Sequence, residues 1–281
     1  LLHADIAHRF YGNERIRLPW FLRYYRGLGV DHFLMVDNGS DDGSREYLAA
    51  QRDVSLWGAD ASYRDSRFGM DWLTALQWRH GHGHWCVTVD VDEFLVYPFC
   101  DARPLGALTD WLESSGLRSF PAMLLDMYPR GRIDAEPYRE DTDPFAIAAW
   151  FDPGNYTIAP DYAMGNLWIQ GGPRARTFFA QAPRQAPALN KIPLVLWNRR
   201  YAYVSSTHML LPRGLNQVHD TLGGEKASGM LLHAKFIDTF AAKAEEEMAR
   251  GQHYADSAES RAHRAAPTPA TPPRRSPAPS R

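Results

Sequence analysis

Two carboxylates spaced two residues apart, Asp90 and Asp92, are the sharpest chemical feature of the sequence. They follow residues 85–89, a predominantly apolar run that predicts a buried strand. Alternation along an extended chain would place both carboxylates on one side. Oxygen ligands of this kind suit Mg²⁺ or Mn²⁺, which also bind substrate phosphates. A solvated strand end, with acids that cap the next turn, is the alternative interpretation.

A second polar cluster spans residues 37–44 and contains Asp37, Asn38 and Ser40. Its Asn, Asp and Gly residues favour the backbone angles of a tight turn. A simple turn is one interpretation, and a loop that hydrogen-bonds the base and ribose of a nucleotide is the other. Asn13 and Glu14, which precede the first predicted helix, belong with the second interpretation.

Strand and helix patterns alternate through the first half of the chain. This alternation predicts an α/β, Rossmann-like, mostly parallel sheet with helices on both faces. In such sheets ligands bind beyond the carboxyl ends of the strands, where both acidic clusters lie. The predicted strands span residues 4–11, 32–36, 53–57, 85–89 and 120–125, and the predicted helices span residues 19–27, 44–51, 70–78 and 104–114.

The second half of the chain is less regular than the first. Short strands are predicted at residues 175–179, 192–197 and 202–206, and a helix at residues 236–250. Residues 261–281 are rich in Pro, Ala, Ser and Arg, a composition that predicts a disordered tail.

Charge and composition exclude several classes of protein. The net charge is −2, but five arginines beyond residue 260 conceal 26 basic against 33 acidic residues in the rest of the chain. An acidic domain of this kind is a poor generic nucleic-acid binder. No apolar run reaches the roughly 18 residues of a membrane-spanning helix. We expect a cytoplasmic protein, with peripheral attachment at the inner membrane as a further option.

The order of the motifs resembles family 2 glycosyltransferases of the GT-A fold, in particular the bacterial family-2-like subgroup that is related to family 92. The resemblance implies one GT-A domain over residues 1–260, with a nucleotide-sugar half at about 1–128 and an irregular acceptor half at about 129–260. It also implies a metal-dependent, hexosyltransferase-type enzyme of polysaccharide biosynthesis. The matching blocks lie at residues 13–14, 18–19, 27–30, 36–43, 89–93, 125–128, 171–176, 191–195, 205–208 and 231–236.

This resemblance assigns roles around a divalent cation, Mn²⁺ or Mg²⁺, that would bridge the diphosphate of a nucleotide-sugar donor. Asp92 would contact the metal directly, and Asp90 would bind it through water or bind the ribose. His233 would complete the metal shell, with an ordinary packed histidine as the alternative. Lys235 would face the same diphosphate. A uridine diphosphate sugar is the expected donor.

The resemblance also assigns the nucleoside end of the donor. Asp37 would hold the base, and the side chains expected near it are Asn13, Glu14, Asn38 and Ser40.

An inverting transfer to a hydroxyl of a glycan, lipid-linked or other acceptor needs a carboxylate that removes the hydroxyl proton. Asp126 ranks first for this role, ahead of Asp220 and Glu225, because it ends the strand that follows the predicted metal site. A retaining transfer stays open as the alternative.

Three other basic residues, Lys191, Arg174 and Arg176, are alternative contacts to phosphate or acceptor. Alternation along an extended chain would put Arg174 and Arg176 on one face, either in a cleft or on a solvated surface. A metal-dependent nucleotidyltransferase or phosphohydrolase would use the same two aspartates. The loop at residues 37–42 lacks a glycine-rich, lysine-bearing phosphate cradle, which favours base recognition. Two departures from the subgroup's pattern are Gly12, which stands where the subgroup has arginine, and the unusual tail. They leave a third interpretation, an inactive homologue that binds a sugar nucleotide.

Overall fold

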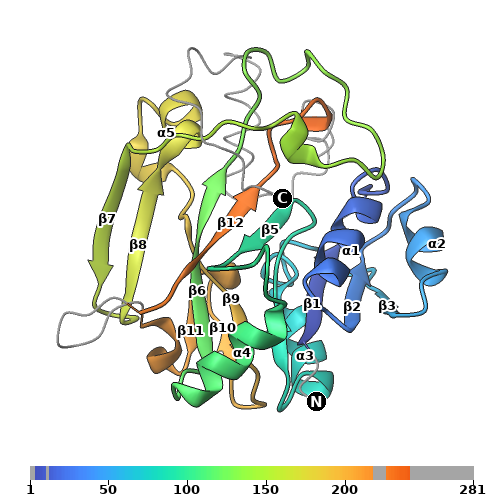
Figure 1. Ribbon diagram of the computed structural model, residues 1–281, viewed down its shortest axis with the longest axis vertical. Coiled ribbons are helices and arrows are strands. Elements are labelled where there is room, and N and C mark those ends of the chain that lie inside the picture. The colour runs from blue at the N-terminus through green and yellow to red at the C-terminus, as the bar shows by residue number, and fades with distance from the viewer. Residues whose placement is uncertain (1–3, 11–12, 218–225, 241–281) are drawn as a thin grey trace.

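The computed structural model describes residues 4–10, 13–217 and 226–240. Its centre is an eight-stranded sheet of order β3-β2-β1-β4-β9-β6-β12-β5 (Figure 1). The strands of this sheet are β1 (Ala4–Phe10), β2 (His32–Asp37), β3 (Val54–Gly58), β4 (Trp85–Val87), β5 (Glu93–Val96), β6 (Ser119–Asp126), β9 (Asn190–Leu196) and β12 (Gly229–His233).

Six of these strands run in one direction, while β9 and β5 run against their neighbours. The predicted α/β, mostly parallel sheet is therefore confirmed. The described helices are α1 (Leu18–Gly27), α2 (Ser44–Ala49), α3 (Met70–His80), α4 (Leu105–Ser114) and α5 (Gly172–Phe178). Two small antiparallel pairs lie outside this sheet, β7 (Tyr156–Asp161) with β8 (Asn166–Gly171) and β10 (Ala202–Tyr203) with β11 (Leu210–Leu211).

Alternation of side chains along the strands builds a core on each face of the sheet. In β4, Trp85 packs into the cluster that contains residues of α1 and α4. Cys86, the next residue, packs with α3 on the opposite face. In β2, Phe33 joins the first core, while Leu34 contacts Leu76 of α3. Helices therefore cover both faces, as the alternation of elements predicts.

Two of the predicted strands are wrong in position or type. The strand predicted at 85–89 ends at Val87, so Asp90 and Asp92 lie in a turn rather than on an extended chain. The strand predicted at 175–179 is instead part of helix α5, because Pro173 sets a helical backbone angle in the first turn. Strand β10 is also shorter than the segment predicted at 202–206.

Some expectations concern residues outside the described ranges. They are the tail at 261–281, residues 241–250 of the helix predicted at 236–250, Gly12, Asp220 and Glu225. Within the described ranges, none of the helices combines the length and apolar character needed to cross a membrane.

The register of the sheet gathers charged residues at one edge. Strands β6 and β12 are parallel and end together, with Asp126 opposite His233. Strand β5 is antiparallel to β12 and begins at Glu93, which is also opposite His233. Strand β9 is antiparallel as well, so Lys191 near its start reaches the same edge. The carboxyl ends of β6 and β12 point to the upper end of the molecule in Figure 1.

Gly229, the first residue of β12, offers a test of this packing. A Cβ added there would lie 2.6 Å from the carbonyl oxygen of Val96 and 2.7 Å from the buried ring of Phe120. We expect Gly229→Ala to lower the free energy of unfolding by about 1–3 kcal/mol in urea titrations, because the strand must shift. Gly106→Ala in α4, where nothing lies within 4 Å, is the matched control and should be neutral or slightly stabilising. Equal effects of the two changes would contradict this packing.

Candidate functional site

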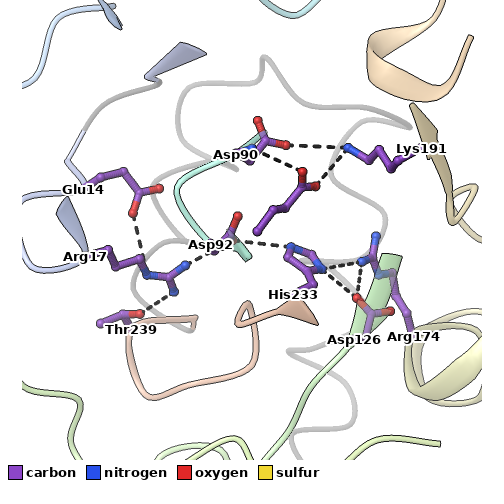
Figure 2. Close-up of polar contacts among 10 residues, drawn as sticks. Glu14, Arg17, Asp90, Asp92, Asp126, Arg174, Lys191, His233 and Thr239 are labelled. Carbon is purple, nitrogen blue, oxygen red and sulfur yellow. Dashed lines mark hydrogen bonds and ion pairs between the residues drawn. The ribbon is translucent and has the colours of Figure 1, made fainter. Parts of the chain in front are cut away.

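Four charged side chains form a line at the edge of the sheet (Figure 2). The Nε2 atom of His233 lies 3.5 Å from Oδ2 of Asp92, and its Nδ1 atom lies 2.7 Å from Oδ1 of Asp126. The guanidinium of Arg174 forms an ion pair with the same Asp126 oxygen. Asp126, Arg174 and His233 are buried, and Asp92 is partly buried. The chain thus places a histidine between two carboxylates. Because buried charges are stable only when they are paired, each member of this line depends on its neighbours.

The surrounding charges set the protonation of this line. Burial lowers the pKa of His233, but the charge of Asp92 and the hydrogen bond with Asp126 outweigh it and raise the pKa to about 9. Burial raises the pKa of Asp126, but the charge of Arg174 and the hydrogen bond from His233 hold it well below its usual range. The pKa of Asp92 is also held low, since the charge of His233 outweighs burial. Both carboxylates are therefore ionised at neutral pH.

Arg17 extends the line on the side of Asp92. Its Nη1 atom lies 3.1 Å from Oδ2 of Asp92, and its Nη2 atom donates to Oγ1 of Thr239 at 2.8 Å. Its Nε atom lies 3.7 Å from Oε2 of Glu14. Arg17 stands directly before α1, so the start of this helix is fastened to the turn after β4.

Lys191 contacts two acidic side chains, Asp90 and Glu93, in the segment that follows β4. Its Nζ atom lies 2.9 Å from Oε1 of Glu93 and 3.9 Å from Oδ2 of Asp90. The amide of Asp90 donates to Oε2 of Glu93 at 3.2 Å, which closes the turn. Burial raises the pKa of Glu93. The side chain of Asp90 is 34% exposed and is directed towards Lys191, so it does not share one side with Asp92 as strand alternation predicted.

The predicted metal ligands meet only in part. Across the described ranges, no three His, Cys, Asp or Glu side chains are grouped closely enough to hold a metal ion. Asp92 and His233 do face each other, whereas Asp90 turns to Lys191. One carboxylate and one imidazole suit Mn²⁺, and Mg²⁺-type sites commonly take few protein ligands and complete the shell with water and phosphate oxygens. The pair therefore fits a cation that arrives with a phosphate ligand.

The loop after β2 is organised by Asp37. Its side chain is 1% exposed, and Oδ1 accepts hydrogen bonds from the amide and hydroxyl of Ser40 at 3.1 and 2.5 Å. Its Oδ2 atom is buried, accepts no hydrogen bond from the residues that the structure describes, and lies 3.5 Å from Nη1 of Arg45. The side-chain amide of Asn38 donates to the carbonyl of Ala61 at 3.2 Å. The turn interpretation is thus correct for Oδ1, and Oδ2 remains as a buried acceptor beside a cation.

Residues 13–17 join this loop to Asp92. Asn13 has a positive φ of 54°, and its Oδ1 atom accepts from the amide of Asp41 at 3.2 Å. The amide of Arg15 donates to Oδ2 of Asp42 at 2.8 Å. Because Arg17, which pairs with Glu14, also contacts Asp92, one short segment links the two acidic clusters.

Asp126 and Lys235 complete the predicted residues. Both carboxylate oxygens of Asp126 are buried, and Oδ1 accepts from two cationic groups. A low pKa and this burial make it a poor acceptor for the proton of a substrate hydroxyl. The amide of Ala234 donates to the carbonyl of Asp92 at 2.8 Å. Lys235 follows, and its charge contributes to the low pKa of Asp92.

Sequence reasoning did not single out Arg17 and gave Glu93 no role of its own. The signal for Arg17 was its position three residues after Glu14 at the start of a predicted helix. Lys191 was named among the alternative contacts, and it is one of only four lysines in the chain. Arg174 and Arg176, expected on one strand face, lie instead on a helix, where a spacing of two directs them to different partners, Asp126 and Asp152.

No protein-family model matches this chain, and no curated protein matches it in sequence. Among solved structures, HddC from Yersinia pseudotuberculosis aligns over 87% of this chain and 99% of its own, with 9% identity and a TM-score of 0.36. A 4-diphosphocytidyl-2C-methyl-D-erythritol synthase aligns over 50% of this chain and 68% of its own, with 18% identity and a TM-score of 0.30. TM-scores this low do not assign the chain to a family.

The raised pKa of His233 predicts a dependence of stability on pH. The folded pKa of about 9 lies above the ordinary 6.5, so protonation stabilises the folded state. This contribution is complete below about pH 6.5 and is lost as the pH rises through about 9. We expect the unfolding free energy of the metal-free protein to fall by about 3 kcal/mol across this window in urea titrations with a chelator.

Two variants control this measurement. His233→Gln should remove most of the decline, whereas His82→Gln, which changes an exposed histidine, should keep the wild-type profile. Identical pH profiles for wild type and His233→Gln would show that His233 is not held as described.

Proposed function

We propose that this chain is a glycosyltransferase that moves a sugar from a nucleoside diphosphate sugar to a hydroxyl acceptor. The observation that carries the proposal is the pairing of Asp92 with His233 at the carboxyl edge of the sheet. Residues 13–17 connect this pair to the loop organised by Asp37. A nucleoside diphosphate has matching parts, a base with hydrogen-bonding edges and a charged diphosphate. The motif order that resembles family 2 glycosyltransferases supports the same assignment.

In this proposal the chain binds the diphosphate with a cluster of cations and a metal pair. Asp92 and His233 would hold a divalent cation, which neutralises negative charge that develops on the departing diphosphate. Arg17, Lys191 and Lys235 would lie on the same charged edge and add positive potential. Asp90 would contact the ribose or a water molecule, as its partial exposure allows.

At the nucleoside end, Asp37 would use its buried Oδ2 atom. This atom accepts no hydrogen bond from the described protein residues, and a base N–H is a suitable donor. Ser40 would hold the carboxylate in place through Oδ1. Asn13, Glu14 and Asn38 would shape the loop around the nucleoside, since each contacts the backbone or a charged neighbour there.

The acceptor side requires a base that removes the hydroxyl proton if the transfer inverts configuration. We do not propose Asp126 as this base, because both of its carboxylate oxygens are buried and its charge is already paired with Arg174. The proposed transfer inverts the configuration of the sugar. The proposed acceptor is a hydroxyl of a glycan, of a lipid-linked molecule or of another compound.

Calorimetric titration with uridine and guanosine diphosphates tests the donor half. We expect a nucleoside diphosphate to bind in the presence of Mn²⁺ and at least about tenfold more weakly without it. Asp92→Asn should abolish the metal dependence, because it removes the anionic ligand. Asp134→Asn, which alters an exposed aspartate paired with Arg132, should change neither value.

The outcome also separates this proposal from its alternatives. Binding that ignores both Mn²⁺ and Asp92→Asn would reject the metal-assisted transferase. Tighter binding of a nucleoside triphosphate, with its conversion to a sugar nucleotide when a sugar phosphate is added, would assign a nucleotidyltransferase instead. Binding of the sugar nucleotide without any hydrolysis or transfer would assign a non-catalytic binding protein.

A further inference from the structure

We propose that Asp126 is a positioning residue, which acts with Arg174 to hold the His233 ring so that its Nε2 atom faces Asp92. This inference rests on the proposed function for its purpose, since the held ring would serve the metal and diphosphate site. It replaces the expected role of Asp126 as a base with a role exerted through His233.

The backbone places these groups before any side-chain contact forms. Asp126 and His233 are register partners at the ends of the parallel strands β6 and β12. The amide of Met127 donates to the carbonyl of His233 at 3.0 Å, which fixes the end of β12. The side chain of Asp126 is 1% exposed, so water does not compete for its oxygens. The short Nδ1 to Oδ1 distance of 2.7 Å then determines how the ring is turned.

Donor and acceptor chemistry determines which ring nitrogen must keep its proton. An ionised carboxylate only accepts hydrogen bonds and a guanidinium only donates them. Nδ1 lies within reach of both groups, at 2.7 Å from Asp126 and 2.9 Å from Arg174. Because the charge of Arg174 keeps Asp126 ionised, the carboxylate requires a proton on Nδ1. The Nε2 atom is then the ring nitrogen that faces Asp92, and it would bind a cation there once its own proton is displaced.

The chain contains a matched pair that lacks this function. Asp152 is also buried, and it forms an ion pair with Arg176, two residues after Arg174 on the same short helix, with Nε to Oδ2 at 2.7 Å. The hydroxyl of Tyr128 donates to Oδ1 of Asp152 at 2.7 Å, and the hydroxyl of Tyr156 donates to its carbonyl oxygen at 2.8 Å. None of these contacts involves His233. Changes at Asp152 therefore measure the cost of breaking a buried aspartate–arginine pair without disturbing the histidine.

The test combines a spectroscopic and a binding measurement on the full chain. Protein labelled with ¹⁵N at histidine Nδ1 is studied by proton NMR without metal or nucleotide. We expect a hydrogen-bonded imidazole proton far downfield of the amides, assigned by its loss in His233→Gln. Asp126→Asn should remove this signal and, in the presence of uridine diphosphate, weaken Mn²⁺ binding about 10–100-fold, as followed by electron paramagnetic resonance. Asp152→Asn should preserve both, and Asp126→Glu should restore part of each.

Several results would overturn the inference. They are a downfield signal that survives Asp126→Asn, a signal that is lost equally in Asp152→Asn, and Mn²⁺ affinity that is unchanged when the signal disappears. If Asp126→Asn fails to fold, the double change Asp126→Asn with Arg174→Gln removes both charges and is compared with Asp152→Asn with Arg176→Gln. If wild-type protein binds neither Mn²⁺ nor nucleotide, the proposed function fails, while the metal-free NMR comparison still decides the role of Asp126.

Discussion

A histidine buried between two carboxylates joins the parts of this molecule that matter for its chemistry. His233 contacts Asp92 in the turn after β4 and Asp126 at the end of β6, so three distant segments of sequence meet at one ring. A buried charge is stable only with partners, and removal of one partner leaves the others uncompensated. The line from Arg17 to Arg174 is therefore best understood as a unit whose members depend on each other.

The charges along this edge are nearly balanced in the described structure. A divalent cation that arrives alone adds positive charge beside Arg17 and Lys191, and a diphosphate that arrives alone adds negative charge beside Asp92 and Glu93. Either added charge is costly at a site that is partly shielded from water, whereas the charges of cation and diphosphate largely cancel when both bind. In the proposed function, metal and nucleotide therefore strengthen each other's binding. This follows from the balance of charge and from the coordination of the metal by the diphosphate. The groups paired at this edge are Glu14 with Arg17, Asp92 with His233, Glu93 with Lys191 and Asp126 with Arg174.

Sequence patterns predicted the sheet and placed Asp37 at its carboxyl edge correctly, because hydrophobic alternation reports burial directly. The family resemblance assigned His233 and Asp92 to one metal shell, and the two side chains do face each other. Sequence patterns failed at the turn after Val87, where the side chain of Glu93 closes the chain on itself and redirects Asp90. They also failed at residues 175–179, where a proline-initiated helix replaced a strand. Contacts such as that of Arg17 with Asp92 depend on tertiary register, which local patterns do not encode.

The most direct measurement is a crystal structure of the chain with Mn²⁺ and a nucleoside diphosphate, recorded with anomalous scattering at the manganese edge. The account predicts one anomalous peak between the Asp92 carboxylate and Nε2 of His233, with diphosphate oxygens in its shell and the base at the loop of Asp37. A manganese peak elsewhere, or a diphosphate bound with no metal between these two side chains, would contradict it.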